Sequence, residues 1–393
     1  MKRIAVALLC MILSVNLLSG CGQSKNVEAG ELPKDQVVTN QPQDAGEEGT
    51  EPIEQEDNQE ETVTEEDDYT KDLTMTSVKG SSGEISYTSV ENIPLEKGGH
   101  IAVVVKQPKS EYWSKVRKGM EAAVKALNKE LGYKGEDKIR LTFEGPSDES
   151  DVESQINIID AVLSENPSVL CIAAVDMNSC QAQLETAAEN GIPVVVLDSG
   201  VNSDLVQTVC STDNYQAGAE AARRLAEAVG ESGKVAVMAH NSSSESSMDR
   251  EKGFREEIAN HQGITVVSTS YESEEESVTE MVSAVLEAHP DLTGYFCTNG
   301  TMTEELLSAL KDREEVQVKV VGFDSGKAQI EAIKDGRETG MIVQNPYGMG
   351  YATIVAAARA EAGMTNDTYI SSGFQWIDVN NLESDDFANY LYE

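Results

Sequence analysis

Residues 194–200 read VVVLDSG and residues 320–326 read VVGFDSG, so two distant parts of the chain each run from apolar residues into Asp-Ser-Gly. A short β-branched run that ends in turn residues predicts a buried strand. The residue directly after the run is Asp198 in the first stretch and Asp324 in the second. Open parallel sheets bind ligands at the carboxyl ends of their strands. We therefore expect both carboxylates to face one shared cleft.

Eight further apolar runs accompany these two, and amphipathic helical patterns separate most of them. The runs are IAVVV (101–105), IRLTF (140–144), VLCIAA (169–174), VQTVC (206–210), KVAVMA (234–239), ITVVSTS (264–270), GYFCT (294–298) and GMIVQ (340–344). Strands that alternate with helices predict parallel sheets covered on both faces. About ten strands over roughly 295 residues are too many for one core, so we expect an α/β protein with two doubly wound parallel-sheet lobes.

The first residues have the composition of an export signal. MKR precedes the short apolar run IAVALLCMILSVNLL, which is typical of a signal peptide over residues 1–20 and is short for a membrane span. The next residues, LSGC (18–21), resemble the lipobox of bacterial lipoproteins, which implies lipidation of Cys21. The alternatives are an ordinary signal with a chance cysteine and an uncleaved N-terminal anchor.

An acidic segment follows the signal. Residues 28–72 hold about seventeen acids and two lysines without apolar periodicity, which predicts a disordered tether. Three prolines in the segment disfavour the alternative, a helical spacer. We assign residues 21–98 to the tether, although EISYTSV (84–90) is also compatible with a short strand on the first lobe. A tether of this kind sets distance from a membrane and leaves affinity unchanged, so a chain starting near Gly99 is expected to bind normally.

Charge and motifs exclude several classes of protein. A net charge of -39 argues against a nucleic-acid binder, which needs a basic face. No G-x-G-x-x-G or P-loop motif follows the first strand, no C-x-x-C pair occurs, and the four histidines lack metal-ligand spacing. We expect no metal and no cofactor. The remaining cysteines are expected to be buried free thiols, although an exported location permits disulfides; they are Cys171, Cys180, Cys210 and Cys297.

The side chains after successive strands suit the recognition of a polyol. Carboxylates accept hydrogen bonds from neighbouring hydroxyls, amides donate and accept, guanidinium groups donate as a fork, and aromatic faces pack on sugar rings. The candidate ligand-binding residues are Lys106, Ser110, Tyr112, Trp113, Asp198, Arg250, Asn299, Asp324 and Gln344. Each has a simpler explanation. The aspartates could cap helices, Arg250 could be a solvated helix residue, Trp113 could be core, and Lys106 could be a surface charge.

Several phrases resemble the ribose-binding type of periplasmic sugar-binding protein, which is similar to the effector domain of the lactose-repressor family. They are IAVVVKQPKSEYWSKVRKGMEAA, GIPVVVLDS, STDNYQAGAEAA, MDREKGF, AHPDLTGYFCTN, VVGFDSGKAQIEAIKDG and VQNPYGMGYAT. The resemblance covers residues 99–393 and implies two lobes joined by a three-crossover hinge. It places residues 99–212 and 345–374 in the N-terminal lobe and residues 213–344 and 375–393 in the C-terminal lobe.

The resemblance also implies a function and a site. It implies hinge closure on a monosaccharide-sized ligand without catalysis, and delivery by a monomeric protein to a membrane ABC importer. The lipobox adds lipid anchoring on the outer face of the cell membrane. In ribose binders the ligand contacts an aromatic pair after the first strand and polar residues after later ones; the matching positions here are Tyr112, Trp113, Asp198, Arg250, Asn299, Asp324 and Gln344.

Three positions depart from the ribose-binding pattern. Ser199 stands where ribose binders carry arginine, Lys106 replaces a serine, and Ser110 replaces an asparagine. An ammonium pairs with fewer ring oxygens than a guanidinium, so ribose itself is not assigned. A lysine after the first strand also occurs in autoinducer-2 receptors of the superfamily, which leaves a furanose-like signal open.

Two other functions compete with transport. The same fold could present its ligand to a chemoreceptor or a sensor kinase. An enzyme would use Asp198 and Asp324 as a glycosidase pair, but one carboxylate must then stay neutral. We expect Arg250 and Lys106 to favour the charged form of both, which disfavours catalysis.

Overall fold

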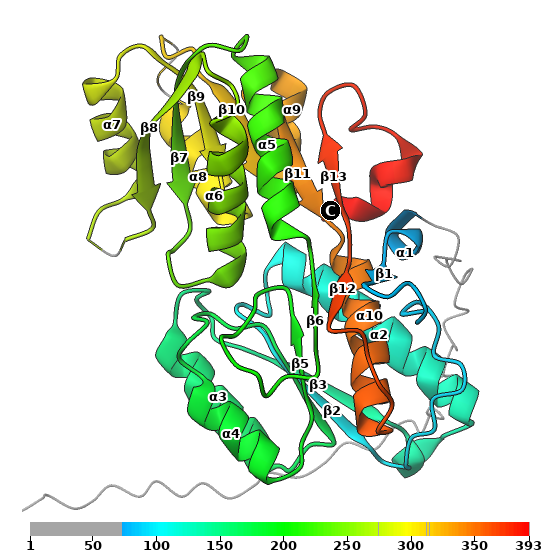
Figure 1. Ribbon diagram of the computed structural model, residues 1–393. Helices are drawn as coiled ribbons and strands as arrows, with labels where there is room; N and C mark the ends of the chain where they lie inside the picture. The colour runs from blue at the N-terminus through cyan, green and yellow to red at the C-terminus, as the bar shows by residue number, and fades with distance from the viewer. Residues whose placement is uncertain (1–72, 274, 312, 314, 393) are drawn as a thin grey trace, which may run out of the picture. The chain divides into compact units, whose positions relative to one another are not determined.

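The computed structural model describes residues 73–392 apart from 274, 312 and 314 (Figure 1). The expected signal peptide, the lipidation site Cys21 and the acidic segment up to residue 72 lie outside the described residues. The described chain forms two sheets with helices on both faces of each, as predicted. No described helix is both long enough and apolar enough to cross a bilayer.

The first lobe contains a seven-stranded sheet. Six of its strands are parallel, and the edge strand β1 pairs antiparallel with β12. In sheet order the strands are β1 (Lys79–Gly80), β12 (Tyr369–Ser371), β6 (Thr208–Ser211), β5 (Val194–Leu197), β4 (Val169–Ile172), β2 (His100–Val104) and β3 (Arg140–Glu144). All of the apolar runs predicted for this lobe are therefore strands.

Helices cover both faces of this sheet because its strands are apolar on both sides. Ile101 and Val103 of β2 pack in one core with α2 (Glu111–Leu131) and α10 (Pro346–Glu361). Ala102 and Val104 point to the other face and pack against α3 (Val152–Ser164) and α4 (Gln181–Glu189). Continuous apolar runs are the pattern expected of parallel strands buried on both faces.

The second lobe contains a six-stranded sheet, parallel except for the edge strand β13. In sheet order the strands are β13 (Phe374–Ile377), β11 (Gly340–Gln344), β10 (Lys319–Phe323), β9 (Leu292–Cys297), β7 (Gly233–Ala239) and β8 (Ile264–Tyr271). Helices α5 (Asn214–Ala228) and α6 (Glu245–Ile258) pack on one face. Helices α7 (Val278–Ala288) and α8 (Gly300–Leu310) cover the other, and α9 (Lys327–Asp335) follows β10.

In each lobe a pair of helices interlocks through glycines. A β-carbon at Gly119 of α2 would collide with the Tyr347 carbonyl of α10, and one at Gly350 of α10 would collide with the Val116 carbonyl. Helices α5 and α6 repeat the device through two glycines, Gly218 against the Arg250 carbonyl and Gly253 against the Tyr215 carbonyl. Side-chain-free contacts let two helix backbones approach closely. They also fix the position of α6, which carries Arg250.

The chain passes between the two sheets three times, after β6, after β11 and after β12. Thr212 at the first crossover donates to the Gln344 side chain at the second, with an Oγ1–Oε1 distance of 2.9 Å. Asn345 at the second crossover donates from its amide nitrogen to the Ser372 carbonyl at the third, over 2.9 Å. The three connections are therefore linked to one another by hydrogen bonds.

The expected tether boundary at residue 98 is wrong, because residues 73–98 pack on the folded part. Helix α1 (Leu73–Thr76) and strand β1 precede a segment in which Tyr87 is 2% exposed. The Tyr87 hydroxyl accepts a hydrogen bond from the Asp367 amide over 2.7 Å, and Tyr133 donates to the Leu95 carbonyl over 2.6 Å. The strand considered for residues 84–90 is absent; β1 lies earlier, at the edge next to β12.

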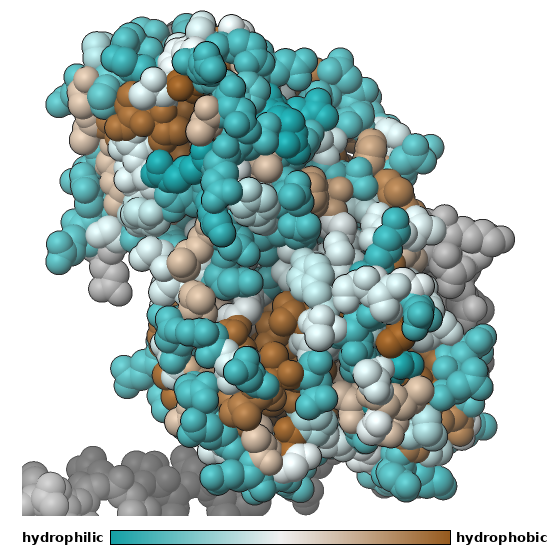
Figure 2. Space-filling model, viewed as in Figure 1, coloured by the Kyte–Doolittle hydropathy of each residue, from teal (hydrophilic) through white to brown (hydrophobic). Residues whose placement is uncertain are grey.

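The outer surface visible in Figure 2 is mainly hydrophilic, with apolar side chains confined to limited patches. The four cysteines of the folded part are free and buried, as predicted from the sequence; they are Cys171, Cys180, Cys210 and Cys297. Burial raises the pKa of the Cys180 thiol to about 11, so this thiol stays protonated and unreactive at neutral pH.

Candidate functional site

The two Asp-Ser-Gly stretches end their strands with the same unusual backbone. Asp198 after β5 has φ 60° and Asp324 after β10 has φ 72°, both in the left-handed region that aspartate tolerates better than most residues. Each aspartate amide still donates to the neighbouring strand, Asp198 to the Cys210 carbonyl and Asp324 to the Ile342 carbonyl. The turn therefore comes immediately after the last sheet hydrogen bond, and both side chains line the same cavity.

This cavity has a volume of about 410 Å³ and takes its walls from both lobes. That volume lies within the range of small-molecule sites in proteins. All nine residues predicted for the site line it: Lys106, Ser110, Tyr112, Trp113, Asp198, Arg250, Asn299, Asp324 and Gln344. The prediction that strand-end residues of different lobes meet in one cleft is thus consistent with the geometry.

Two tyrosines hold the two aspartates. Tyr112 donates to Asp198 Oδ1 over 2.6 Å, and Tyr392 donates to Asp324 Oδ1 over 2.9 Å. Gln344 donates from its amide nitrogen to the same Asp324 oxygen over 2.7 Å. Burial raises the pKa of both tyrosines well above 10.0, and the nearby carboxylates raise it further, so each phenol remains a donor.

Arg250 is not a solvated helix residue, because it is only 4% exposed. Its guanidinium donates from Nε to Asn214 Oδ1 over 2.8 Å and from Nη1 to the Thr298 carbonyl over 2.9 Å. The guanidinium carbon lies 3.7 Å from the centroid of the Phe323 ring, in cation–π contact. These contacts fix the guanidinium beside the cavity at the carboxyl ends of β9 and β10.

Lys106 is also buried, with 6% exposure, and is not a surface charge. Its ammonium donates to Ser244 Oγ of the second lobe over 2.7 Å. Ser244 lies 3.2 Å from Ser199 Oγ, so the serine that replaces the arginine of ribose binders belongs to a cluster joining the lobes. Burial lowers the pKa of Lys106, and nearby Asp198 and Glu149 partly oppose that shift.

Arg250 favours the charged form of Asp324, as expected, but burial acts in the opposite direction. Burial raises the pKa of Asp324, and this outweighs Arg250, Gln344 and Tyr392, which lower it. The structure therefore weakens one argument made from the sequence against a glycosidase pair. Asp324 nevertheless donates no proton to any group of the site; its oxygens accept from Gln344, Tyr392 and the Gly300 amide.

Two other candidate residues of the site, Ser110 and Asn299, also cap helices. The Ser110 hydroxyl accepts from the Trp113 amide over 3.3 Å and caps α2, and Asn299 Oδ1 accepts from the Met302 amide over 3.0 Å and caps α8. Neither aspartate caps the helix that follows it in the chain. Trp113 is 4% exposed and packs in the core of the first lobe while one edge lines the cavity, with its ring 5.1 Å from that of Tyr112.

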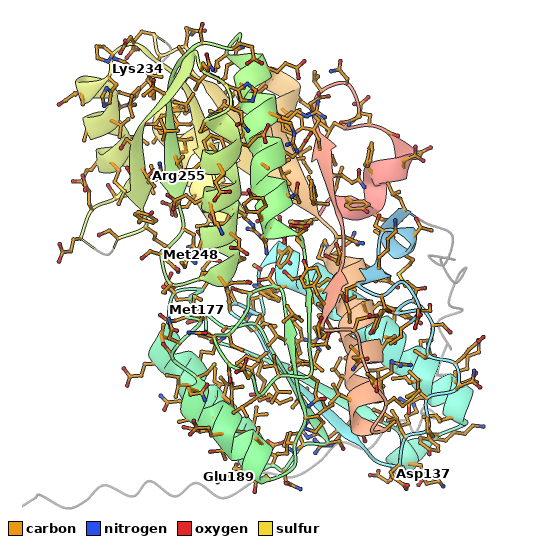
Figure 3. All side chains as sticks on the ribbon, viewed as in Figure 1. Asp137, Met177, Glu189, Lys234, Met248 and Arg255 are labelled. Carbon is orange, nitrogen blue, oxygen red and sulfur yellow. The ribbon has the colours of Figure 1, made fainter. Side chains whose placement is uncertain are left out.

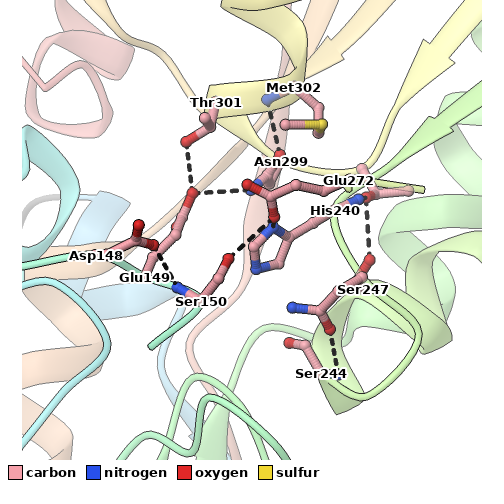
Figure 4. Close-up of polar contacts among 12 residues, drawn as sticks. Asp148, Glu149, Ser150, His240, Ser244, Ser247, Glu272, Asn299, Thr301 and Met302 are labelled. Carbon is pink, nitrogen blue, oxygen red and sulfur yellow. Dashed lines mark hydrogen bonds and ion pairs between the residues drawn. The ribbon is translucent and has the colours of Figure 1, made fainter. Parts of the chain in front are cut away.

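Sequence reasoning missed several residues at the mouth of the cavity, where the lobes meet (Figure 4). Glu149 of the first lobe accepts from Thr301 Oγ1 over 2.6 Å. Ser150 donates to Glu272 over 3.1 Å, and Glu272 lies 2.6 Å from Nδ1 of His240. Of these residues only His240 directly follows a predicted strand, β7, and could have been found from the sequence in this way. The others do not directly follow a strand predicted to face the cleft.

Further hydrogen bonds join the two lobes. The Met177 amide donates to the Ser243 carbonyl over 3.0 Å, and the Gly200 amide donates to Glu245 Oε2 over 3.0 Å. Figure 3 shows Met177 and Met248 on facing sides of this junction. The two lobes are thus joined by direct polar bridges.

Charged side chains of both signs line the cavity. Two cations, Lys106 and Arg250, lie near two anions, Asp198 and Asp324, and the lining also includes four glutamates. Asp198 opposes the lowering of the Lys106 pKa by burial, and Arg250 opposes the raising of the Asp324 pKa by burial. Yet no ion pair within 4.0 Å joins any of the four to another in the part of the chain that the structure describes. The two cations and the two anions therefore line one cavity without a direct ion pair among them.

Comparison with known families identifies the architecture. The periplasmic binding protein domain matches residues 101–364. The D-ribose/D-allose-binding protein of Pseudomonas aeruginosa is 28% identical over 274 residues, which cover 67% of this chain and 83% of that protein. The ribose import binding protein RbsB of Bacillus subtilis is 25% identical over 209 residues, covering 53% of this chain and 68% of that protein.

Solved structures agree with this match. An ABC transporter solute-binding protein from Agrobacterium vitis with bound D-fucose is 28% identical, has a TM-score of 0.68, and is aligned over 75% of this chain and 100% of its own. A second protein from the same species, bound to α-D-tagatopyranose, is 27% identical with a TM-score of 0.69, over 75% of this chain and 99% of its own.

Proposed function

Because the chain belongs to the periplasmic binding protein family, within its sugar-binding ABC-transporter branch, we propose that it is the lipid-anchored solute-binding component of an ABC importer. Its ligand is a neutral monosaccharide or a similar small polyol, which it binds without chemical change. The relatives named above bind ribose, allose, fucose or tagatose, and the ligand of this chain belongs to the same chemical class.

The observation that carries this proposal is the set of separated charges in the cavity. A hydroxyl accepts from an ammonium or guanidinium and donates to a carboxylate at the same time. A polyol placed among Lys106, Asp198, Arg250 and Asp324 would connect each cation to an anion. Four glutamates also line the cavity and give it an excess of negative charge, which disfavours an anionic ligand; they are Glu111, Glu149, Glu304 and Glu305. Buried polar groups are costly when unpaired, and this cost favours a ligand with several hydroxyls.

The proposed mechanism is closure of the two lobes about the three crossovers. The ligand contacts residues of both lobes, and these contacts exist together only when the lobes approach each other. The bridges at the mouth, Glu149 to Thr301 and Ser150 to Glu272, would add to the stability of the closed form. Binding energy from the ligand thus selects one arrangement, which the importer then recognises.

The remaining elements of the proposal concern location and partners. The signal peptide and the lipobox at Cys21 would place the mature protein on the outer face of the cell membrane. The acidic segment up to residue 72 would connect the lipid to the folded part. The partner is a membrane permease of an ABC importer, and the protein acts as a monomer.

Thermal unfolding of the mature protein with a panel of pentoses, hexoses, polyols and nucleosides tests the ligand class. One clear stabiliser is expected among the monosaccharides, with its effect lost in Arg250→Ala and Asp324→Ala. A shift with nucleosides alone, or with none of the compounds, would contradict the sugar assignment. Uptake of the stabilising sugar by cells lacking the gene tests transport; unchanged uptake with a lost transcriptional response would indicate sensing instead.

A further inference from the structure

The C-terminal tail, residues 378–392, returns from the edge of the second sheet to the ligand cavity. After β13 it forms the 3-10 helix η3 (Asp385–Tyr390) and ends with Tyr392 among the residues that line the cavity. Tyr392 is 6% exposed. Its ring centroid lies 5.6 Å from that of Tyr112, in an edge contact with an interplanar angle of 64°. This residue lies beyond the matched family domain, which ends at residue 364.

The tail is attached to both lobes close to Tyr392. Lys115 of α2 in the first lobe donates to the Leu391 carbonyl over 3.2 Å. Ser325 of the second lobe donates to the Tyr390 carbonyl over 3.2 Å. The Tyr390 hydroxyl lies 2.8 Å from Ser77 Oγ, in the segment that precedes the first lobe. The position of Tyr392 is therefore set by contacts on either side of the cavity rather than by the tail alone.

Tyr392 mirrors Tyr112 in its chemistry. Each tyrosine donates to the aspartate of one Asp-Ser-Gly stretch, and Gln344 at the second crossover contacts both sides through Asp324 and the Tyr112 hydroxyl. The two rings touch, so they close the end of the cavity that lies next to the crossovers. Lys106, Asn299 and the bridging residues Glu149 and Thr301 also line the cavity.

We propose that Tyr392 is a specificity-determining wall of the ligand cavity, whose ring limits the bound sugar to a single ring and whose hydroxyl orients Asp324 toward it. This inference rests on the proposed sugar-binding function. Asp324 Oδ1 already accepts from Tyr392 and Gln344, and Oδ2 accepts from the Gly300 amide. The carboxylate is thereby held in one orientation before a ligand arrives, which lowers the entropic cost of binding.

A purely structural role would have a different consequence. Tyr392 also packs in a small core with Ile330, Met341 and Tyr390, so its removal could loosen the tail. Loosening lowers the affinity for every ligand together, whereas loss of a wall changes the ratio of affinities for ligands of different size. The ratio within one variant is therefore the informative measurement.

The experiment is calorimetric titration of the full mature chain with D-ribose, D-allose, D-tagatose and maltose. The wild type is expected to bind at least one monosaccharide and to exclude the disaccharide. Tyr392→Ala should shift the ratio of the maltose Kd to the best monosaccharide Kd by more than tenfold in favour of maltose. Tyr392→Phe keeps the wall and should still exclude maltose, while its monosaccharide affinity falls about tenfold, because a hydrogen bond to a charged group is lost.

Tyr369→Phe is the matched control. Its hydroxyl donates to the Ser211 carbonyl outside the cavity, so its loss should leave all four titrations unchanged. A ratio in Tyr392→Ala within twofold of the wild type would overturn the proposal. If that variant does not fold, an unchanged monosaccharide affinity in Tyr392→Phe overturns it instead. A wild type that binds none of the monosaccharides would contradict the proposed function itself, which is a separate outcome.

Discussion

Replacing Lys106 by methionine should make the unliganded protein more stable and its ligand binding weaker. The ammonium is 6% exposed, has no ion pair within 4.0 Å among the described residues, and makes a hydrogen bond of 2.7 Å to Ser244. Burial lowers the pKa of Lys106. When folding lowers the pKa of a group, its contribution to stability is complete above the unfolded pKa and is lost as the pH falls through the folded pKa. The charged form of Lys106 therefore opposes folding at neutral pH.

The size of the effect follows from the contacts that remain. Replacing a buried ion by an apolar side chain of similar volume is neutral to stabilising by about 1–4 kcal/mol. Ser244 keeps Ser199 and Ser246 as neighbours at 3.2 Å, so it is not left unpaired. Asp198 loses a nearby cation but keeps the hydrogen bond from Tyr112. We therefore expect stabilisation of about 1–2 kcal/mol, which raises the Tm by roughly 2–3 °C for a folded part of this size.

The affinity should change in the opposite direction. A ligand hydroxyl that accepts from the ammonium contributes about 1.5–3 kcal/mol, so Lys106→Met should raise the Kd about 10- to 100-fold. Calorimetry of unfolding without ligand and titration with the stabilising sugar measure the two effects. Lys109→Met, at an exposed position of the same loop outside the cavity, is the control and should alter neither. A Tm lowered by Lys106→Met would refute the argument that burial of this charge costs stability.

Three further predictions concern pH, packing and the N-terminal boundary. Burial raises the pKa of Asp324 above 3.8, so sugar affinity should rise as the pH rises through that pKa and the carboxylate becomes charged. The contribution of this carboxyl group to the free energy of unfolding is lost over the same pH range. Titrations with sugar at several pH values should show this dependence in the wild type and not in Asp324→Asn. Gly218→Ala should destabilise by about 1–3 kcal/mol in denaturant unfolding and weaken sugar binding, since a β-carbon there displaces the backbone of Arg250. A chain starting at residue 73 should unfold at the wild-type temperature. One starting at residue 99 lacks the buried Tyr87, so its free energy of unfolding should fall by several kcal/mol. Equal melting temperatures of the two chains would contradict this prediction.

The sequence was sufficient for the central strands and for the site residues that follow them. All ten apolar runs are strands, because a strand buried on both faces needs a continuous apolar stretch. Three short strands were not predicted. Strands β1, β12 and β13 have two to four residues and are only partly buried, and they pair with β12, β6 and β11 respectively through contacts distant in sequence. Nothing local distinguishes them from loops.

The residues missed at the site share a physical cause. Tyr392 reaches the cavity only because a tail of about fifteen residues is held by Lys115 and Ser325, and neither contact has a sequence pattern. Glu149 and Thr301 meet across the two lobes, so their proximity depends on the lobe arrangement rather than on either sheet. Examining the residues that follow predicted strands identifies the site residues that one sheet contributes. It does not identify residues that the other lobe or the C-terminal tail contributes to the same cavity.

The repeated Asp-Ser-Gly ending gives both lobes the same arrangement at the end of one strand. In each lobe a left-handed aspartate donates its own amide to the neighbouring strand, and a tyrosine from another element donates to its carboxylate. The serine positions then diverge. Ser199 joins the cluster with Ser244 between the lobes, whereas Ser325 binds the C-terminal tail. The two aspartates suit sugars in general, which many related proteins bind. The elements that contact the serines and the tyrosines differ between the two lobes. Selectivity within that class is therefore expected to reside in Lys106 and Tyr392 more than in the aspartates themselves.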